Sequence, residues 1–329
     1  MSLDFAELIR PAPRRSVFAM DGWYVWCGSM VRTPDGVCHL LFSRWPQKLG
    51  HNAWVTHSEI GHATATDPLG PYTFQGVALA GAGGDAWDRD VAHNPTVIAA
   101  RGKYYLYYMG NRGNGEYWNH RNNQRVGVPE TDHPAGPWKR ADKPVIDVTP
   151  GAWDCWMTSN PTCCAGPNGK FVMLYKGVGA GPMPKGGAVL CGVAIAEHPL
   201  GPFRKYPDPI IRNPENPWAV EDPFVWHQDD RYYCIIKDFQ GYFTHAEKGA
   251  TALFESQDGI DWAPARNPLA FKREIHWEDG EVQKVANLER PQLWLENGRP
   301  AVLFCACDPD LEGKRLSSFN VHIPLASER

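Results

Sequence analysis

A motif that recurs five times constrains the fold of this chain more than any other feature. In the clearest copy, HNPTVIAARGKYYLYYMGN (93–111), a polar triplet ending in proline leads into an apolar run, a turn and a tyrosine-rich run. Further copies begin at SNP (159–161), EDP (221–223) and ERP (289–291), and a fainter copy covers CGSMVRTPDGVCHLLFSRW (27–45). The anchor positions are 66, 66, 62 and 68 residues apart: Ser29, Pro95, Pro161, Pro223 and Pro291.

A second landmark repeats with a similar period. It is the turn of segments such as HATATDPLGPYTF (62–74), and its glycines are 66, 65 and 58 residues apart: Gly70, Gly136, Gly201 and Gly259. Each unit therefore contains four short strands joined by Pro/Gly turns. Five such units predict an all-β, five-bladed β-propeller with four-stranded antiparallel blades around a central axial site. We expect one domain over 1–329, with blades at roughly 27–80, 91–145, 157–210, 219–270 and 287–325, closed by 10–26.

The composition argues against two classes of binding partner, nucleic acids and membranes. The 33 basic and 37 acidic residues are dispersed, so no nucleic-acid surface is expected. No run of about 18 apolar residues is present, so no membrane partner is expected either. The nine cysteines fall mostly in strand-like runs, which is typical of buried free thiols in a reducing environment. Because the first residues also lack a signal-peptide pattern, we expect a cytoplasmic protein.

The polar triplets gather at one place in a propeller. The first strand of each blade lines the axis, so the strand starts meet at one mouth, together with the ends of the second strands. The first group contains His93, Asn94, Ser159, Asn160, Glu221, Asp222, Glu289 and Arg290, and the second contains Arg44, Lys176, Lys237 and Asp238. Two loops, 45–59 and 111–125, are longer than their blades need and are expected to be functional. They hold His51, Trp54, Trp118, His120 and Arg121.

Carboxylates, amides, basic groups and tryptophans in one concave site suit a sugar. Amides and charged groups bind hydroxyls, and aromatic faces cover the C–H side of the ring. Cleavage of a glycosidic bond needs one acid to protonate the leaving oxygen and one base to activate water or attack. Glu221 and Asp222 are the strongest candidates, because paired carboxylates at an axial strand start are costly without a role.

The triplet EDPFVW (221–226), within five repeats, resembles the five-bladed propeller glycoside hydrolases of families 43 and 117. Families 32, 62 and 130 share the architecture. The resemblance implies that Glu221 is the general acid. In family 43 the base is an aspartate at the start of blade one, where this chain has CGSM (27–30), and a third aspartate lies in blade three, where this chain has SNP.

The departures from the family 43 pattern leave the base open. Asp21 and Asp90 are the candidates for the base, and Asp238 is the candidate for tuning the acid. By resemblance to family 117, a histidine at 93 or 245 could transfer a proton. No cofactor is required by this chemistry. A Ca²⁺ ion in the channel, bound by oxygens of Asp222, Asn160 and Asn94, is a further expectation from the resemblance.

These observations predict an exo-acting, inverting glycoside hydrolase that removes a terminal sugar from an oligosaccharide. The residues expected to bind the substrate are His93, Asn94, Asn160, Asp222, Glu289, Arg290, Arg44, Lys176 and His120. A phosphorylase like those of family 130 is one alternative. Its phosphate would need a basic cluster drawn from Arg44, Arg112, Arg121, Lys176 and Arg290. A carbohydrate-binding propeller without catalysis is the other alternative.

Overall fold

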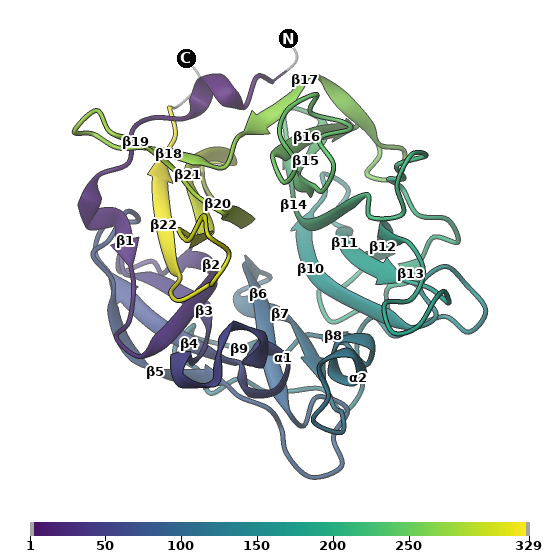
Figure 1. Cartoon of the computed structure of the whole chain (residues 1–329). Helices are drawn as coiled ribbons and strands as arrows, with labels where there is room; N and C mark the ends of the chain where they lie inside the picture. The colour runs from purple at the N-terminus through teal and green to yellow at the C-terminus, as the bar shows by residue number, and fades with distance from the viewer. Residues whose placement is uncertain (1–2, 327–329) are drawn as a thin grey trace.

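The computed structural model describes residues 3–326 and consists almost entirely of antiparallel β-sheets. Five sheets surround a central axis (Figure 1). The inner strands contact one another in chain order, β2–β6–β10–β14–β20, and β20 returns to β2. The predicted all-β, five-bladed propeller is therefore confirmed. Within 3–326, no helix has the length and apolar character needed to cross a membrane.

The blades follow the repeat, with the strand nearest the axis first in four of them. Blade one contains β2 (Trp23–Arg32), β3 (Cys38–Pro46), β4 (Glu59–Ala65) and β5 (Thr73–Leu79). Blade three contains β10 (Met157–Ala165), β11 (Phe171–Val178), β12 (Val189–Ala196) and β13 (Arg204–Lys205). Blade four contains β14 (Val220–Gln228), β15 (Arg231–Asp238), β16 (Thr251–Ser256) and β17 (Ala263–Phe271).

The other two blades are less regular. In blade two, β6 (Val91–Ala100) pairs with β7 (Lys103–Asn111). On its other side β7 pairs with a third strand that is split into β8 (Arg125–Gly127) and β9 (Glu130–Thr131). Blade five contains β20 (Asn287–Glu296), β21 (Arg299–Asp308) and β22 (Phe319–Pro324), and β1 (Val17–Phe18) forms its outer edge. An N-terminal segment thus completes the last sheet. A hairpin of β18 (Glu274–His276) and β19 (Val282–Lys284) precedes blade five.

Apolar cores lie between neighbouring blades rather than within them. Phe224 and Trp226 of blade four, for example, pack with Leu293 and Leu303 of blade five in one cluster. Comparable clusters join blades one and two, two and three, three and four, and five and one. Each blade therefore buries its faces against its neighbours, which is why five copies of the motif are needed to complete the core.

A β-bulge near the start of each inner strand explains the polar triplets. The pairing with the second strand shifts at the same point in all five blades. One residue of each bulge has a positive φ, between 49° and 61°: Cys27, Asn94, Asn160, Asp222 and Arg290. Neighbouring residues on a regular strand point to opposite faces, whereas a bulge re-aims a side chain. The bulge therefore lets two successive side chains serve the axial site.

The register predicted for blade one is wrong by one residue. The bulges show that Gly28, not Ser29, is the counterpart of Pro95. Ser29 instead matches Thr162, because its hydroxyl accepts a bond from the amide of Val97 at 3.0 Å. Thr162 accepts the same bond from the next blade at 3.1 Å. Blade one has no proline to mark the bulge, so its register had no fixed reference point in the repeat.

Candidate active site

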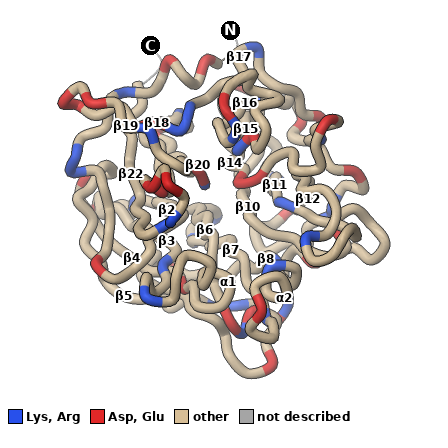
Figure 2. Tube along the Cα trace, viewed as in Figure 1, with Lys and Arg blue, Asp and Glu red and all other residues tan. Residues whose placement is uncertain are grey.

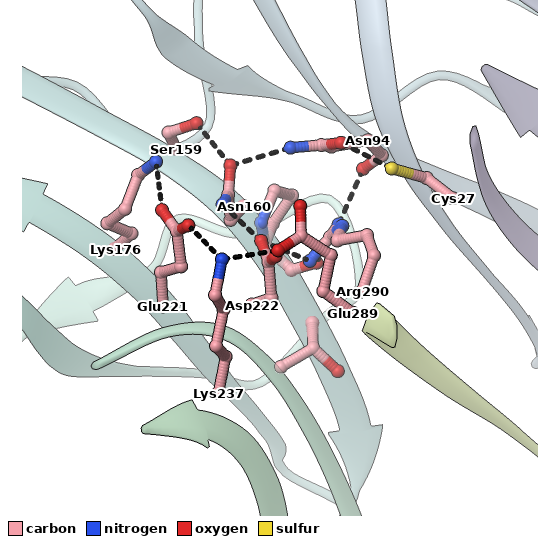
Figure 3. A network of polar contacts seen from close by, with 12 residues as sticks. Cys27, Asn94, Ser159, Asn160, Lys176, Glu221, Asp222, Lys237, Glu289 and Arg290 are labelled. Carbon is pink, nitrogen blue, oxygen red and sulfur yellow. Dashed lines mark hydrogen bonds and ion pairs between the residues drawn. The ribbon is translucent and has the colours of Figure 1, made fainter. Parts of the chain in front are cut away.

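The five bulge residues form a ring of polar contacts across the axis (Figure 3). The Cys27 thiol donates to Asn94 Oδ1 at 2.6 Å, and Asn94 Nδ2 donates to Asn160 Oδ1 at 2.7 Å. Asn160 Nδ2 then donates to Asp222 Oδ1 at 2.5 Å. Arg290, 1% exposed, lies 3.9 Å from Asp222 and donates to the Asn94 carbonyl at 2.9 Å. We call these five residues the axial ring.

The axial ring does not fit the calcium ion that the resemblance implied. Asn94 Oδ1 already accepts a bond from Cys27, and Asn160 Oδ1 accepts bonds from Asn94 and from Ser159. Calcium prefers free oxygen ligands, whereas here the amide oxygens are engaged and the Arg290 guanidinium lies beside them. The chemistry below therefore uses side chains alone.

The residue before each bulge forms a second layer, toward the mouth. In blades one to five these residues are Trp26, His93, Ser159, Glu221 and Glu289. Acidic and basic positions gather where β14 and β20 face the axis (Figure 2). Glu221 lies 3.2 Å from Lys176 Nζ and 3.4 Å from Lys237 Nζ. Lys237 also makes a close ion pair with Glu289. An ammonium group thus occupies the space between two carboxylates.

Glu221 and Asp222 have pKa values that move in opposite directions. Burial favours the neutral form of Glu221, but the ammonium groups of Lys176 and Lys237 outweigh it and lower the pKa of Glu221 to about 2. Burial and the charge of Glu221 raise the pKa of Asp222 to about 7, although Arg290 opposes the rise. Between these two pKa values the pair keeps one proton, which resides on Asp222 and is lost as pH rises through about 7.

Both acids line a pocket of about 270 Å³ at the mouth. Its walls come from all five blades and are rich in aromatic residues: Trp26, Trp45, His51, Trp54, Tyr117, Trp118, Trp218 and Phe239. Trp54 belongs to the short helix α1 (Trp54–His57), and Trp118 and Arg121 belong to α2 (Tyr117–Asn122). The two helices contact each other over blades one and two. The long loops of these blades therefore close one side of the pocket.

Two histidines of the pocket are neutral at physiological pH. Burial lowers the pKa of His51 to about 4, and burial together with the charge of Arg290 holds the pKa of His93 well below its usual range. His51 Nδ1 lies 3.4 Å from an Arg315 nitrogen, so that atom accepts and the ring proton is on Nε2. His93 stacks on Trp54 with ring centres 4.9 Å apart, and its Nδ1 is 2.7 Å from the Ser58 hydroxyl.

Known proteins resemble the chain in structure. No protein-family model and no curated protein matches its sequence. A family 117 glycoside hydrolase of the marine bacterium Zobellia galactanivorans has a TM-score of 0.65 at 20% identity, over 92% of this chain and 85% of that one. A protein described as a glycoside hydrolase gives 0.73 at 15% identity (99% and 94%), and a thermostable family-43 glycoside hydrolase gives 0.66 at 10% (97% and 94%).

The chain has the propeller fold of these hydrolases. At such low identity the likeness establishes the propeller alone, and the chemistry depends on the residues of the pocket. Most of the predicted axial residues of the propeller do meet there: His93, Asn94, Asn160, Lys176, Glu221, Asp222 and Glu289 line the pocket. Arg290 lies directly against Asp222.

Asp238 and Arg44, which were predicted from the ends of second strands, point away from the propeller axis. Glu221 pairs with Lys237 and Ser159 with Lys176, so these lysines occupy the positions that face the axis. Asp238 lies one residue further along its strand, and a one-residue step reverses the direction of a side chain. The buried Asp238 carboxylate instead accepts the amides of Phe243 and Thr244 at 2.8 and 3.0 Å.

Arg44 is displaced from the axis in the same way. In blade one, Trp26 pairs with Ser43, so Ser43 is the counterpart of the axial lysines and Arg44 points to the other face. Its guanidinium binds Glu59 at 2.7 Å and lies 4.0 Å from the centre of the Trp23 ring. The structure therefore places Arg44 outside the pocket lining, against Glu59 and Trp23.

The three remaining predicted site residues, Asp21, Asp90 and His120, also lie outside the pocket lining. Asp21 is exposed in the turn before β2, and it is not among the described residues that line the pocket. Asp90 accepts the Gly113 amide at 2.8 Å and thereby fixes the loop after β7. Both ring nitrogens of His120 are engaged in the same loop, one of them 3.1 Å from Asn111 Oδ1. These contacts of Asp90 and His120 stabilise the loop after β7, and neither residue is part of the pocket lining.

The sequence placed several residues at the mouth without indicating their role in the pocket. Lys237 is the most important, because it neutralises Glu221 and Glu289 together. Its signal was the repeat itself, since it follows the EDP triplet at the same distance, within a residue, as Lys176 follows SNP. His51, Trp54 and Arg121 come from the two long loops, whose length was the only signal for them.

Proposed function

We propose that this protein is a glycoside hydrolase that removes a terminal sugar from an oligosaccharide. The observation that supports it most is the Glu221–Asp222 pair, whose separated pKa values lie in a pocket walled by tryptophans. Acid–base cleavage of a glycosidic bond needs a proton donor, and this pair holds one proton below about pH 7. The contact between α1 and α2 closes one side of the mouth and favours exo action.

In this proposal the Glu221–Asp222 pair supplies the proton to the leaving oxygen. The role of Glu221 as sole general acid is revised, because the two lysines keep it ionised in the resting protein. Asp222 holds the proton, and Glu221 is the more exposed member, with 18% of its side chain accessible against 6% for Asp222. Because the two groups titrate together, the pair is treated as one donor.

We assign activation of water to His93. The ligand oxygens of Glu221, Asp222 and Glu289 lie within 4.8 Å of one another, whereas an inverting pair needs about 6.5–9.5 Å. None of the described residues places another carboxylate in the pocket lining. His93 belongs to blade two and Glu221 to blade four, so the axis lies between them. The role of His93 as base requires the tautomer in which Nδ1 donates to the Ser58 hydroxyl, 2.7 Å away, and Nε2 keeps its lone pair for water.

The test is release of a monosaccharide from a panel of oligosaccharides, with the product anomer followed by NMR. Inversion is expected, and retention would contradict the role of His93. Phosphate is not expected to accelerate turnover, because Arg44 and Arg112 lie outside the pocket, and Lys176 and Arg290 are paired with Glu221 and Asp222, which leaves Arg121 alone of the predicted basic cluster. Sugar binding without cleavage of any member of the panel would favour the non-catalytic alternative.

The rate should fall as pH rises through about 7. The pair loses its last proton there, because the pKa of Asp222 is raised to about 7. Below that pH the proton is present, and Glu221 stays ionised down to about pH 2. The profile of kcat/KM between pH 5 and 9 should therefore show one descending limb on the alkaline side. A rate that is constant from pH 6 to 9 would exclude the pair as proton donor.

A further inference from the structure

The charged groups at the mouth are paired with one exception. Four basic residues each have a carboxylate within 4.0 Å: Lys176 with Glu221, Lys237 with Glu289, Arg290 with Asp222 and Arg315 with Asp308. Arg121 lines the same pocket and is 5% exposed. Within residues 3–326 it has no carboxylate partner within 4.0 Å, and Glu221 acts on it only from farther away. A buried guanidinium without a counter-ion is unfavourable.

Arg121 is nevertheless held firmly in place. Its Nη1 donates to the Lys185 carbonyl at 2.9 Å and to Asn122 Oδ1 at 3.0 Å. Its guanidinium lies 5.7 Å from the Trp118 ring centre and 5.8 Å from that of Trp218. These neutral contacts orient the group but leave its charge uncompensated. The pocket thus presents a fixed positive charge between two aromatic walls.

We propose that Arg121 binds an anionic group of the substrate, so that the sugar in the pocket carries a carboxylate or a sulfate ester. This inference rests on the proposed function and adds the charge of the substrate to it. The planar guanidinium matches two oxygens of either group, and Trp118 and Trp218 offer faces for the sugar ring. Arg315 at the rim, whose side chain is 46% exposed, is paired with Asp308 and adds guanidinium donors at the entrance.

Calorimetry with matched pairs of sugars tests the proposal on the full chain. The pairs are galactose and galacturonate, glucose and glucuronate, and galactose and galactose 6-sulfate, with sulfate and phosphate ions alone as further probes. The anionic member of at least one pair should bind about tenfold or more tightly than the neutral member. Comparison of the uronates with the sulfate ester shows whether Arg121 binds a carboxylate or a sulfate group. Arg121→Gln should reduce the preference to about twofold.

Three further variants keep the test decisive. Arg112→Gln is the matched control, because Arg112 is exposed in the same loop but outside the pocket lining, and it should change nothing. Arg121→Lys keeps the charge without the planar fork and should give an intermediate preference. If Arg121→Gln fails to fold, Arg315→Gln at the rim should still weaken anionic binding about twofold, with less dependence on salt.

The outcomes separate this inference from the proposed function. Equal binding of anionic and neutral sugars, or a preference that survives both Arg121 variants, would overturn the inference, and cleavage of neutral oligosaccharides would still support a hydrolase. Binding of galacturonate that depends on Arg121, without cleavage of any glycoside, would support the inference and contradict the hydrolase. Cleavage that requires phosphate, with phosphate binding dependent on Arg121, would assign the anion to a co-substrate and overturn the inference.

Discussion

Replacing Glu221 with glutamine is expected to lower kcat/KM on the cleaved glycoside by about 10²–10⁴-fold. The negative charge of Glu221 helps to raise the pKa of Asp222, so its removal makes Asp222 release its proton at lower pH. It also removes the carboxylate that Lys176 and Lys237 share. The variant therefore loses the proton donor at neutral pH, and the alkaline limb of its residual activity should move to lower pH.

Asp222→Asn should lower kcat/KM by a similar factor. The carboxyl group that remains, Glu221, is ionised at neutral pH and has no proton to donate. The double variant should be little worse than either single variant, since residues that act as a unit are not additive. Asp21→Asn is the control: Asp21 is an exposed acid outside the pocket lining and should retain wild-type turnover. Near-ultraviolet circular dichroism checks that each variant is folded. Wild-type turnover in Glu221→Gln would remove the pair from the mechanism.

The fold could be predicted because each bulge leaves a mark in the sequence. In four blades a polar residue with positive φ is followed by proline, as at Asn94-Pro95, and this dipeptide keeps the period visible. In blade one the dipeptide is Cys27-Gly28, which carries no such mark, and the predicted register slipped by one residue. The split third strand of blade two left no mark either.

The site could be predicted where it depends on the inner strands alone. Asn94, Asn160 and Asp222 were found because successive blades repeat the same bulge. Asp238 and Arg44 were expected at the mouth but lie on the other face of their strands, because a strand end predicts the position of a residue only to within one step, and one step reverses the side chain. Arg121 depends on how the 111–125 loop folds over the mouth, which no period specifies.

At pH 8.5, where Asp222 is ionised, replacing Arg290 with methionine is expected to lower the free energy of unfolding by about 3–5 kcal/mol, because it breaks a buried charged pair from one side. Arg290 is 1% exposed, lies 3.9 Å from Asp222 and donates to the Asn94 carbonyl. Methionine keeps most of the side-chain volume but removes the charge and the donors. Urea denaturation followed by tryptophan fluorescence measures the loss, and exposed Arg32→Met should change stability by less than about 0.5 kcal/mol.

The loss of unfolding free energy in Arg290→Met should increase with pH. The folded pKa of Asp222 is raised to about 7 from an ordinary value of 3.8, so Asp222 favours the folded state below about pH 4, and this contribution is lost as pH rises to 7. Arg290 opposes that rise, so its removal raises the pKa of Asp222 further and extends the loss above pH 7. The deficit of Arg290→Met should therefore be larger at pH 8.5 than at pH 6.

A double-mutant comparison tests whether the interaction between Arg290 and Asp222 causes the pH dependence of the stability loss. In an Asp222→Asn background there is no carboxyl group to titrate, so the deficit caused by Arg290→Met should become independent of pH between 6 and 8.5. The part that remains reports the lost bond to the Asn94 carbonyl and any change in packing. An equal deficit at both pH values in the wild-type background would show that Arg290 does not act on Asp222. The alkaline limb of activity would then be set by Glu221 and burial alone, and it should not move in Arg290→Met.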